Sequence, residues 1–404
     1  MQASFLRNAI ILGLLSAIGP FAIDMYLPAL PSIGADLQAS GSAVQLSLLV
    51  FFLSMGFGQI LIGPLSDIYG RKLPLYVGLI VFALASIGAA LAPTVESLIA
   101  FRFLQGLGAA PGMVVPRAVV RDLHTGPQAA RLMSMLMLVF SVSPILAPLT
   151  GSFIIEAFGW RAVFWSVLFA AAIAFALLAL GLRETRPQEE RLGSSMGGAL
   201  RAYGGLFRDR NFLGLTAIGG FGVSSFFVYL ANSPFVIIDH FGMSPTAYSL
   251  LFSVNAVAFF AMSQLTGRLT QRFGLRRVVR VAVTGYAILM LALAAVAALG
   301  PISLVVMASL LFVGFGFLGL VIPTTSVLAM EDYGENAGVA SALMGTLHFA
   351  IGAAAMAASG VFFDGTPLPM IIGVSACAAI AFVIASVTLA TPRRVRQMEI
   401  APAE

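Results

Sequence analysis

The sequence has few of the side chains on which disulfides, metal sites and most enzyme centres depend. Its 404 residues include one cysteine, Cys377, and three histidines. These numbers exclude an intrachain disulfide and a cysteine-based metal cluster, and they argue against a zinc site. Charged residues make up only 10%, far below the roughly 25% of soluble domains. No GxxxxGK[ST] loop is present, so ATP is not the expected energy source, and we predict neither a metal nor a cofactor.

Apolar residues dominate instead, with 59% hydrophobic residues and a mean hydropathy of +0.99. Runs of roughly 20 apolar residues follow one another, each long enough for the ~30 Å hydrocarbon core of a bilayer. Backbone groups in lipid must be satisfied internally, so these runs should be helices, and their continuous apolarity argues against a membrane barrel. The first run lacks a cleavage site and is interpreted as an uncleaved span. Twelve spans are predicted, at residues 8–31, 44–65, 73–92, 96–117, 131–154, 161–182, 211–233, 246–266, 277–299, 302–326, 337–362 and 369–390.

The basic residues lie on one side of this topology. If the N-terminus is cytoplasmic, 20 of the 22 lysines and arginines fall in cytoplasmic segments, and only Arg102 and Arg161 do not. This bias indicates an even number of spans with both termini in the cytoplasm. The net charge of +5 is therefore explained by topology, and we predict no nucleic-acid partner.

Two sequence echoes divide the chain into halves. Gly63–Lys72 reads GPLSDIYGRK and Gly267–Arg276 reads GRLTQRFGLR, with matching residues at one constant spacing of about half the chain. Gly106–Pro116 is repeated, with one deletion, at Gly314–Pro323. Internal repeats of this kind mark many transporter folds. The expected fold is an all-α membrane protein of two pseudo-symmetric six-helix bundles, residues 1–182 and 211–392, with a charged linker at 183–210 and a cytoplasmic tail at 393–404.

Four motifs carry a family resemblance that covers essentially the whole chain. Gly63–Lys72 resembles motif A of the major facilitator superfamily, and Arg102–Gly108 resembles motif B. Ala147–Gly151 is similar to motif C, the antiporter signature, although Ala147 stands where glycine is usual. Asp24–Pro31 (DMYLPALP) resembles the helix 1 signature of the bicyclomycin-resistance (Bcr/CflA) branch of drug exporters.

The resemblance implies a bacterial inner-membrane transporter that exports lipophilic antibiotics or other small molecules in exchange for protons by alternating access. Each chain contains both halves, so a monomer would suffice, with substrate, protons and the lipid bilayer as partners. A metabolite or nutrient carrier of the same fold, either symporter or uniporter, is the alternative. An intramembrane enzyme would need a second catalytic acid, a Ser/Lys pair or a histidine cluster at membrane depth. The sequence shows none, so we predict that the chain is not an enzyme.

Asp24 and Arg102 are the two ionised groups expected deep within spans. Counting 1.5 Å per residue, both lie on the order of 10 Å below the outer surface. A charge at such depth costs at least ~2.5–3.5 kcal/mol, so each should face a cavity or a partner. We hypothesise that Asp24 carries the coupled proton and that Arg102, water access and substrate control its protonation. A fixed structural ion pair between them is the alternative.

Motif A is expected to act as a gating latch formed by Gly63, Asp67, Gly70, Arg71 and Asp122. Asp67 would accept backbone N–H bonds at the start of a helix near residue 337, and Arg71 would pair with Asp122. By family likeness these contacts would hold the outward-open state. The alternative is a solvated loop that only sets topology.

Pro144, Pro148 and Gly151 interrupt the fifth span. Proline removes a backbone hydrogen bond and bends a helix, and small residues permit close helix approach. We expect a hinge or a tight seam that limits proton leakage, with the ordinary tolerance of membrane helices for proline as the alternative.

The substrate cavity should be lined, by the resemblance, by the first, fourth, seventh and tenth spans. Aromatic and methionine side chains offer adaptable contacts, although packing or lipid contact can explain each of them singly. Asn255 and His348 are possible further polar members, and Trp165 is ambiguous. The nominated cavity residues are Tyr26, Gln105, Met113, Phe226, Phe227, Tyr229 and Asn232.

Overall fold

The computed structural model describes residues 2–191, 195–331, 333 and 337–390. Twelve helices in this part of the chain are long and apolar enough to cross a membrane, which confirms the predicted all-α membrane fold. The tail expected at 393–404 and residues 334–336, which precede the eleventh span, lie outside the described residues.

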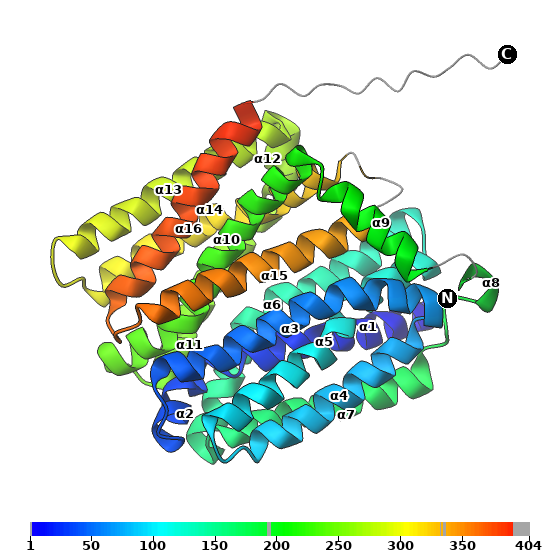
Figure 1. Ribbon diagram of the computed structural model, residues 1–404, viewed down its shortest axis with the longest axis horizontal. Helices are drawn as coiled ribbons and strands as arrows, with labels where there is room; N and C mark the ends of the chain where they lie inside the picture. Colours follow the sequence, from blue (N-terminus) through cyan, green and yellow to red (C-terminus); the bar gives the residue numbers. More distant parts are fainter. Residues whose placement is uncertain (1, 192–194, 332, 334–336, 391–404) are drawn as a thin grey trace.

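The first half of the chain forms six spans, and Figure 1 draws them in blue to green. Each helix of this half packs against others of the same half, with α5 held between α3 and α4. The elements are α1 (Gln2–Asp24), the short η1 (Leu27–Ala29), α2 (Leu30–Asp36), α3 (Gly41–Tyr69), α4 (Lys72–Ala90), α5 (Val95–Leu123), α6 (Gly126–Phe158) and α7 (Arg161–Gly181).

The second half, green to red in Figure 1, forms the other six spans. Two short helices precede it, α8 (Gln188–Arg191) and α9 (Met196–Leu206). The elements of the second half are α10 (Arg210–Pro234), the π-helical η2 (Phe235–His240), α11 (Pro245–Gln264), α12 (Thr266–Phe273), α13 (Leu275–Ala298), α14 (Leu304–Met330), α15 (Ala337–Val361) and α16 (Pro367–Ala390).

Helix starts follow local chemistry. The hydroxyls of Ser40, Ser244 and Ser303 each accept a hydrogen bond from a backbone N–H in the first turn of the following helix. Such caps satisfy donors that have no partner inside the helix. Asp209 does the same for α10, where its Oδ1 accepts from the backbone N–H groups of residues 211 and 212.

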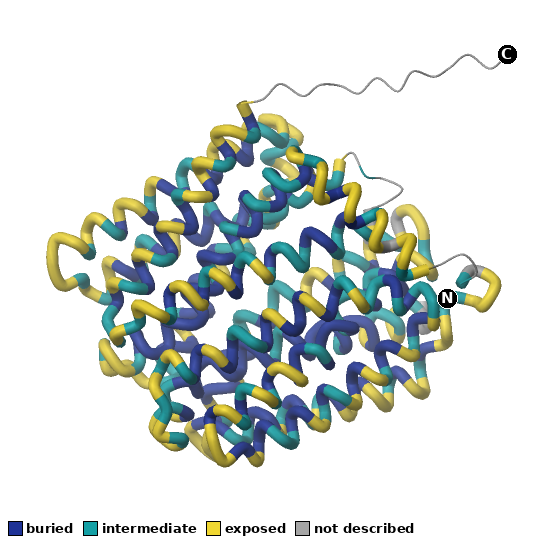
Figure 2. The backbone as a smooth tube through the Cα atoms, in the orientation of Figure 1, coloured by how far each residue is buried: buried dark blue, intermediate teal, exposed yellow. Residues whose placement is uncertain are grey.

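Many large apolar side chains lie exposed on the outside of the bundle, unlike those of a typical soluble protein. Figure 2 shows buried backbone in the middle of the bundle and many exposed positions on the outward faces of the helices. Large apolar side chains are among those exposed, including Phe153 and Phe169 at 70% and Leu180 at 89%. Apolar surface of this extent suits contact with lipid.

The first span is not one continuous helix. It was predicted to run over residues 8–31, but α1 ends at Asp24 and the chain re-forms a helix only through η1 and α2, as far as Asp36. The helix α6 crosses this break closely, because a β-carbon on Gly151 would lie 2.4 Å from the backbone oxygen of Met25. Broken spans are tolerated where protein covers the freed backbone groups.

The halves meet along two seams, α3 against α15 and α6 against α11. Arg71, Arg121 and Arg186 lie at one end of the bundle, called the basic end below. The other end, with Asp36, Glu156 and Asp364, is called the acidic end. These two seams and two ends provide the frame for the candidate site.

Candidate functional site

Asp24 lies at the end of α1, where the first span breaks. Its side chain is 5% exposed, and its Oδ2 accepts a hydrogen bond of 3.2 Å from the Ser143 hydroxyl on α6. The carboxyl group is therefore buried at membrane depth beside the break and next to the proline-containing part of α6.

Arg102 is fully buried on α5. Its guanidinium carbon lies 4.4 Å from the ring centre of Tyr26 and 4.1 Å from that of Phe51, in the geometry of cation–π contacts. Nη1 donates to the Ala22 carbonyl at 3.2 Å and to Gln105 Oε1 at 2.5 Å. Among the residues that the structure describes, Nε and Nη2 have no hydrogen-bond partner.

Asp24 and Arg102 form no ion pair with each other; the ion pairs within the described residues involve other side chains. The predicted alternative of a fixed structural pair is therefore not formed among the described residues in this conformation. A buried arginine with two donors unsatisfied is costly. The arrangement leaves Nε and Nη2 of the guanidinium able to donate to an anionic or carbonyl group when neighbouring side chains move.

Two of the nominated cavity residues support Arg102 in this structure. Gln105 is fully buried and lies between the guanidinium and Ser86, to whose hydroxyl it donates at 2.8 Å. The hydroxyl of Tyr26, also fully buried, is 2.7 Å from Ser47 Oγ. Neither side chain borders open space here, and both fix the position of the arginine.

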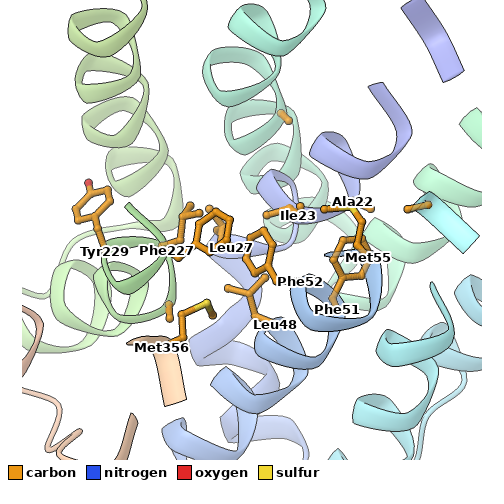
Figure 3. Packing of buried hydrophobic residues seen from close by; sticks show 14 of the residues in the cluster. Ala22, Ile23, Leu27, Leu48, Phe51, Phe52, Met55, Phe227, Tyr229 and Met356 are labelled. Atoms are coloured by element: carbon orange, nitrogen blue, oxygen red, sulfur yellow. The ribbon is translucent and has the colours of Figure 1, made fainter. Parts of the chain in front are cut away.

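Phe227 and Asn232, on α10, lie at the junction of the halves. The ring of Phe227 stacks on Phe52 of α3 with ring centres 4.1 Å apart, and Figure 3 shows the two rings beside Leu27. Asn232 Oδ1 accepts a 3.2 Å bond from Gln45 of α3. These predicted cavity residues thus close the seam in this conformation.

Phe226 and Tyr229 belong to an aromatic cluster inside the second half. Tyr229 stacks on Phe252 with ring centres 5.9 Å apart, and Phe226 lies 5.7 Å from Phe315. The Tyr229 hydroxyl accepts from the Asn255 side chain at 3.1 Å. In this conformation Asn255 therefore orients Tyr229 within the cluster.

The remaining nominated side chains have mixed surroundings. Met113 is partly buried and packs against the core of the first half. His348 is buried, with Nε2 3.2 Å from the Thr216 carbonyl. Trp165 is 45% exposed. Within the described residues no group of three or more histidine, cysteine or acidic side chains is placed to hold a metal.

Pro144, Pro148 and Gly151 all lie within α6 at its seam with α11. Two hydroxyls of α11 donate to carbonyls of this segment, Ser249 to Pro148 at 2.9 Å and Ser253 to Ile145 at 2.8 Å. With the close approach of Gly151 to the break in the first span, these bonds make the segment a tight inter-half seam. Its action as a hinge stays a prediction.

The motif A turn is held by Arg71, which is 4% exposed. Arg71 binds Asp122 through Nε at 2.7 Å and Nη2 at 3.2 Å, so the predicted ion pair is present. Its Nη1 also donates to Asp67 and to Ser66. All these residues belong to the first half. The pair itself lies within one half, and the part of motif A in a latch between the halves stays a prediction.

Asp67 is the member of motif A that faces the second half. Its Oδ1 accepts from Arg71 at 2.7 Å and from Arg186 at 2.9 Å. It lines a cavity of about 630 Å³ together with Gly63, and Gly338 and Val339 at the start of α15 line the same cavity. The expected bonds to the start of α15 are not found among the described residues, and the residues just before that helix lie outside them.

The linker supplies partners that the sequence did not reveal. Glu184 accepts backbone N–H bonds from Arg71 at 2.9 Å and from Lys72 at 3.1 Å, at the N-terminus of α4, where a carboxylate is favoured. Partial burial raises the pKa of the Glu184 carboxyl, but the backbone N–H groups of four residues outweigh it and hold the pKa below its ordinary value. In a sequence, a run of charged residues indicates a solvated segment. Only the alternation of acidic and basic residues is a signal that this linker docks on the rest of the protein.

The two ends of the seams differ. At the acidic end α3 and α10 are joined by the bond between Gln45 and Asn232, and Glu156 of α6 accepts from the Thr246 hydroxyl of α11 at 2.8 Å. At the basic end the 630 Å³ cavity separates α3 and α5 from the start of α15. Side-chain hydrogen bonds thus bridge the halves at the acidic end, and the 630 Å³ cavity separates them at the basic end.

Comparison with known proteins identifies relatives of this chain. A family profile described as the Major Facilitator Superfamily matches residues 12–357. An "uncharacterized MFS-type transporter YdgK" of Bacillus subtilis is 38% identical over 368 residues, covering 90% of this chain and 91% of the relative. A "bicyclomycin resistance protein homolog" of Haemophilus influenzae is 30% identical over 380 residues, covering 91% of this chain and 92% of the relative.

The fold also matches solved structures. A D-xylose–proton symporter superposes with a TM-score of 0.72 and covers 95% of this chain and 97% of its own, at 17% sequence identity. At that identity the likeness concerns the arrangement of helices and not the substrate.

Proposed function

Since the chain belongs to the Major Facilitator Superfamily and transports small molecules across a membrane, not acting as an enzyme, we propose that it exports lipophilic antibiotics or similar molecules in exchange for protons. The basic end is cytoplasmic in this proposal, because lysine and arginine are retained on that side. The membrane is the bacterial inner membrane. Rocking of the bundles 1–182 and 211–392 about the two seams provides alternating access.

The observation that carries the proposal is the pair of incompletely satisfied ionisable groups at the break in the first span. Asp24 has one hydroxyl donor, from Ser143, and Arg102 has two donors without a partner. A buried carboxyl group with so few partners is stable in its protonated, neutral form, whereas its ionised form needs a charged or hydrogen-bonding partner. Gaining and losing a proton therefore changes what the site must bind.

This difference suggests an exchange cycle. With the site open to the outside, Asp24 takes up a proton, and substrate leaves because it no longer compensates the carboxylate. The neutral site can then close and reopen to the cytoplasm. There a new substrate displaces the proton, and Arg102, whose Nε and Nη2 are unused, offers a second partner for the ionised state or for a carbonyl of the substrate.

The substrate class rests on the lining and on relatives. Aromatic side chains at the seam, Phe227 and Phe52 among them, provide apolar contact of low specificity. A relative at 30% identity carries the name bicyclomycin resistance protein homolog. The lining supports an apolar substrate, and the relative's name supports an antibiotic, more than a sugar or an anion.

The test is proton movement in liposomes that contain the purified protein, with lipophilic cations and neutral antibiotics added singly. Wild type should move protons when substrate is added, and Asp24→Asn should lose this coupling by at least tenfold. Ser143→Ala, which removes only the hydroxyl donor, should retain it. Coupling of wild-type size in Asp24→Asn would contradict the proposal. Substrate movement without protons in both proteins would make the chain a facilitator.

A further inference from the structure

The charge of Arg102 lies between aromatic rings. Its guanidinium carbon is 4.1 Å from the ring centre of Phe51 on α3, 4.4 Å from that of Tyr26 and 6.0 Å from that of Phe164 on α7. All four side chains are at most 1% exposed. Rings at these distances attract a cation through the negative charge of their faces, and more strongly where water is excluded. The two nearer rings, Tyr26 and Phe51, are called the ring clamp below.

The ring clamp takes the place of a counter-ion. Within the described residues, Arg102 and Asp24 take part in none of the ion pairs. A buried cation without an anionic partner is unfavourable, so the ring faces compensate the charge of Arg102 while Asp24 is not paired with it. The spans around Arg102 contain one acidic residue, Asp24, in segments 1–35, 37–66, 97–121 and 157–183.

The clamp is built on the break in the first span. Tyr26 follows Asp24 by two residues, and Ala22, whose carbonyl accepts from Arg102 Nη1 at 3.2 Å, precedes it by two. The Asp24 side chain instead accepts from Ser143 of α6. Residues on both sides of Asp24 thus contact the guanidinium, while the carboxyl group binds another helix. A movement of this short segment would change both sets of contacts.

The rings have supports that do not involve the cation. The Tyr26 hydroxyl is 2.7 Å from Ser47 Oγ, and Ser47 and Phe51 are four residues apart, on one face of α3. Arg102 has a long side chain, and its Nε and Nη2 have no partner among the described residues. The guanidinium is therefore the part of the clamp that can leave, and the rings are the part that stays.

We propose that the ring clamp is an exchangeable counter-charge for Arg102, which makes Tyr26 and Phe51 positioning residues of proton exchange. While Asp24 is protonated, the rings hold the guanidinium. When Asp24 releases its proton to the cytoplasm, Nε and Nη2 of Arg102 move to the carboxylate and leave the rings. The inference rests on the proposed proton exchange, to which it adds the attraction that returns Arg102 when Asp24 is protonated again.

The other titratable side chains that face Asp24 and Arg102 are phenols. Tyr26 lies at the break, and Tyr248 of α11 interacts electrostatically with Asp24 and with Tyr229 of α10. A phenol ionises only near pH 10. Below that pH, a change in the position of Arg102 therefore follows from Asp24. The neighbouring parts of α3, α6 and α7 contain no titratable residue, in segments 41–66, 132–155 and 162–182.

The experiment replaces Phe51 in the full-length protein by phenylalanine with one, two or three ring fluorines. Each fluorine withdraws electron density from the ring face and weakens its attraction for a cation, with little change in shape. The infrared band of the protonated Asp24 carboxyl group, identified by its absence from Asp24→Asn, is followed against pH in detergent without substrate. A weaker clamp releases Arg102 more readily, so each fluorine should shift the loss of the band to lower pH. Three fluorines should raise the ionisation constant about fivefold.

Controls separate the clamp from packing. Phe82 of α4 is fully buried, as Phe51 is, and no cation of the described residues lies over its ring. The same fluorines at Phe82 should leave the band unchanged. In an Arg102→Met background, fluorines at Phe51 should have no effect, because no cation remains. Phe164, with the most distant ring of the three, should give a smaller shift than Phe51.

Several outcomes would overturn the proposal. These are a band that does not shift when Phe51 is fluorinated, an equal shift at Phe82, or an equal shift in the Arg102→Met background. A band that persists at every pH at which the protein stays folded would also overturn it, because nothing would then draw the guanidinium from the rings. Each variant is first checked for a wild-type elution profile and thermal transition.

The readout needs no substrate, so the two proposals fail separately. A stepwise shift at Phe51 without substrate-linked proton movement in liposomes would retain the clamp and reject the exchange. An unchanged band at Phe51, together with coupling that is lost in Asp24→Asn, would reject the clamp alone.

Discussion

The two copies of the repeated turn share a backbone and differ in almost everything attached to it. Gly70 and Gly274 close the turns with φ of +90° and +81°. In the first copy a β-carbon on Gly70 would lie 2.5 Å from Arg191 and 2.6 Å from Glu184, whereas no atom of the described residues lies within 4 Å of the same point on Gly274. The repeat specifies the turn, and the linker covers only one copy of it.

The side chains of the two copies also differ in their contacts. Gln271 and Leu275 occupy the positions of Asp67 and Arg71, and no side chain of α12 is buried. Arg71 binds Asp67 within the first copy, and two further partners come from outside the repeat, Asp122 from α5 and Glu184 from the linker. Sequence symmetry therefore coexists with a one-sided charge network, placed beside the cavity at the basic end.

The largest effect is expected when the first copy is given the residue of the second. Arg71→Leu leaves Asp67 and Asp122 without their shared cation and should lower the free energy of unfolding by roughly 3 kcal/mol. Arg272→Ala, at an exposed arginine of the second turn, should change it by less than about 0.5 kcal/mol. Thermal unfolding in detergent measures both. Equal losses would show that the network contributes nothing particular.

A double variant sharpens this test. Asp67→Gln added to Arg71→Leu copies the second turn at both positions and removes one stranded carboxylate. Part of the loss, about 1 kcal/mol, should return, since contacting residues are not additive. A double variant that is less stable than Arg71→Leu alone would argue that Arg186, the other partner of Asp67, carries that carboxylate unaided.

A second comparison uses the glycines. Gly70 (φ +90°, ψ +169°) and Gly274 (φ +81°, ψ +147°) lie near a backbone region that is essentially open only to glycine. Alanine there costs of order 1–3 kcal/mol, so Gly70→Ala and Gly274→Ala share that loss. Only Gly70→Ala must also displace Arg191 and Glu184, and it should lose roughly 1 kcal/mol more. Equal thermal shifts in the two variants would mean that the linker does not rest on the turn in solution.

Much of this arrangement was predictable because it is local or periodic. Hydropathy gave the twelve spans, and the echo of Gly63–Lys72 gave the repeat. The pairing of Arg71 with Asp122 followed from the family motif. Hydropathy reports the length of an apolar run but not its continuity, so the break after Asp24 was missed although Pro28 and Pro31 stood beside it.

The rest depended on contacts between distant segments. Glu184 meets the backbone of Arg71 across more than a hundred residues, and a lone acid in a charged linker carries no mark of its partner. Equal depth brought Asp24 and Arg102 to one level of the membrane. It did not reveal that Gln105 and the ring of Tyr26 engage the guanidinium instead. Depth can be counted along a helix, whereas the direction of a side chain depends on packing.

The smallest effect concerns the contact between Glu184 and the first turn, which should respond to pH. The pKa of Glu184 is held below its ordinary value by the N–H groups of Arg71 and its neighbours, which outweigh the effect of partial burial. A carboxyl group with a lowered folded-state pKa stabilises the docked linker above the unfolded value, near 4.3. That contribution is lost as the pH falls below the unfolded value and through the lower folded one.

Hydrogen exchange of the Arg71 and Lys72 amides reports this contact directly. After correction for the intrinsic pH dependence, protection in wild type should be constant above the unfolded pKa of about 4.3. It should fall by a few-fold as the pH drops through the lower folded value, as expected for an interaction of up to about 1 kcal/mol. Glu184→Gln should show the lower protection throughout, without the pH step. Glu189→Gln, at an exposed acid of the neighbouring α8, should retain the step. A pH step that persists in Glu184→Gln would assign it to another group, and the linker would then rest on the turn through Arg186 and Arg191 alone.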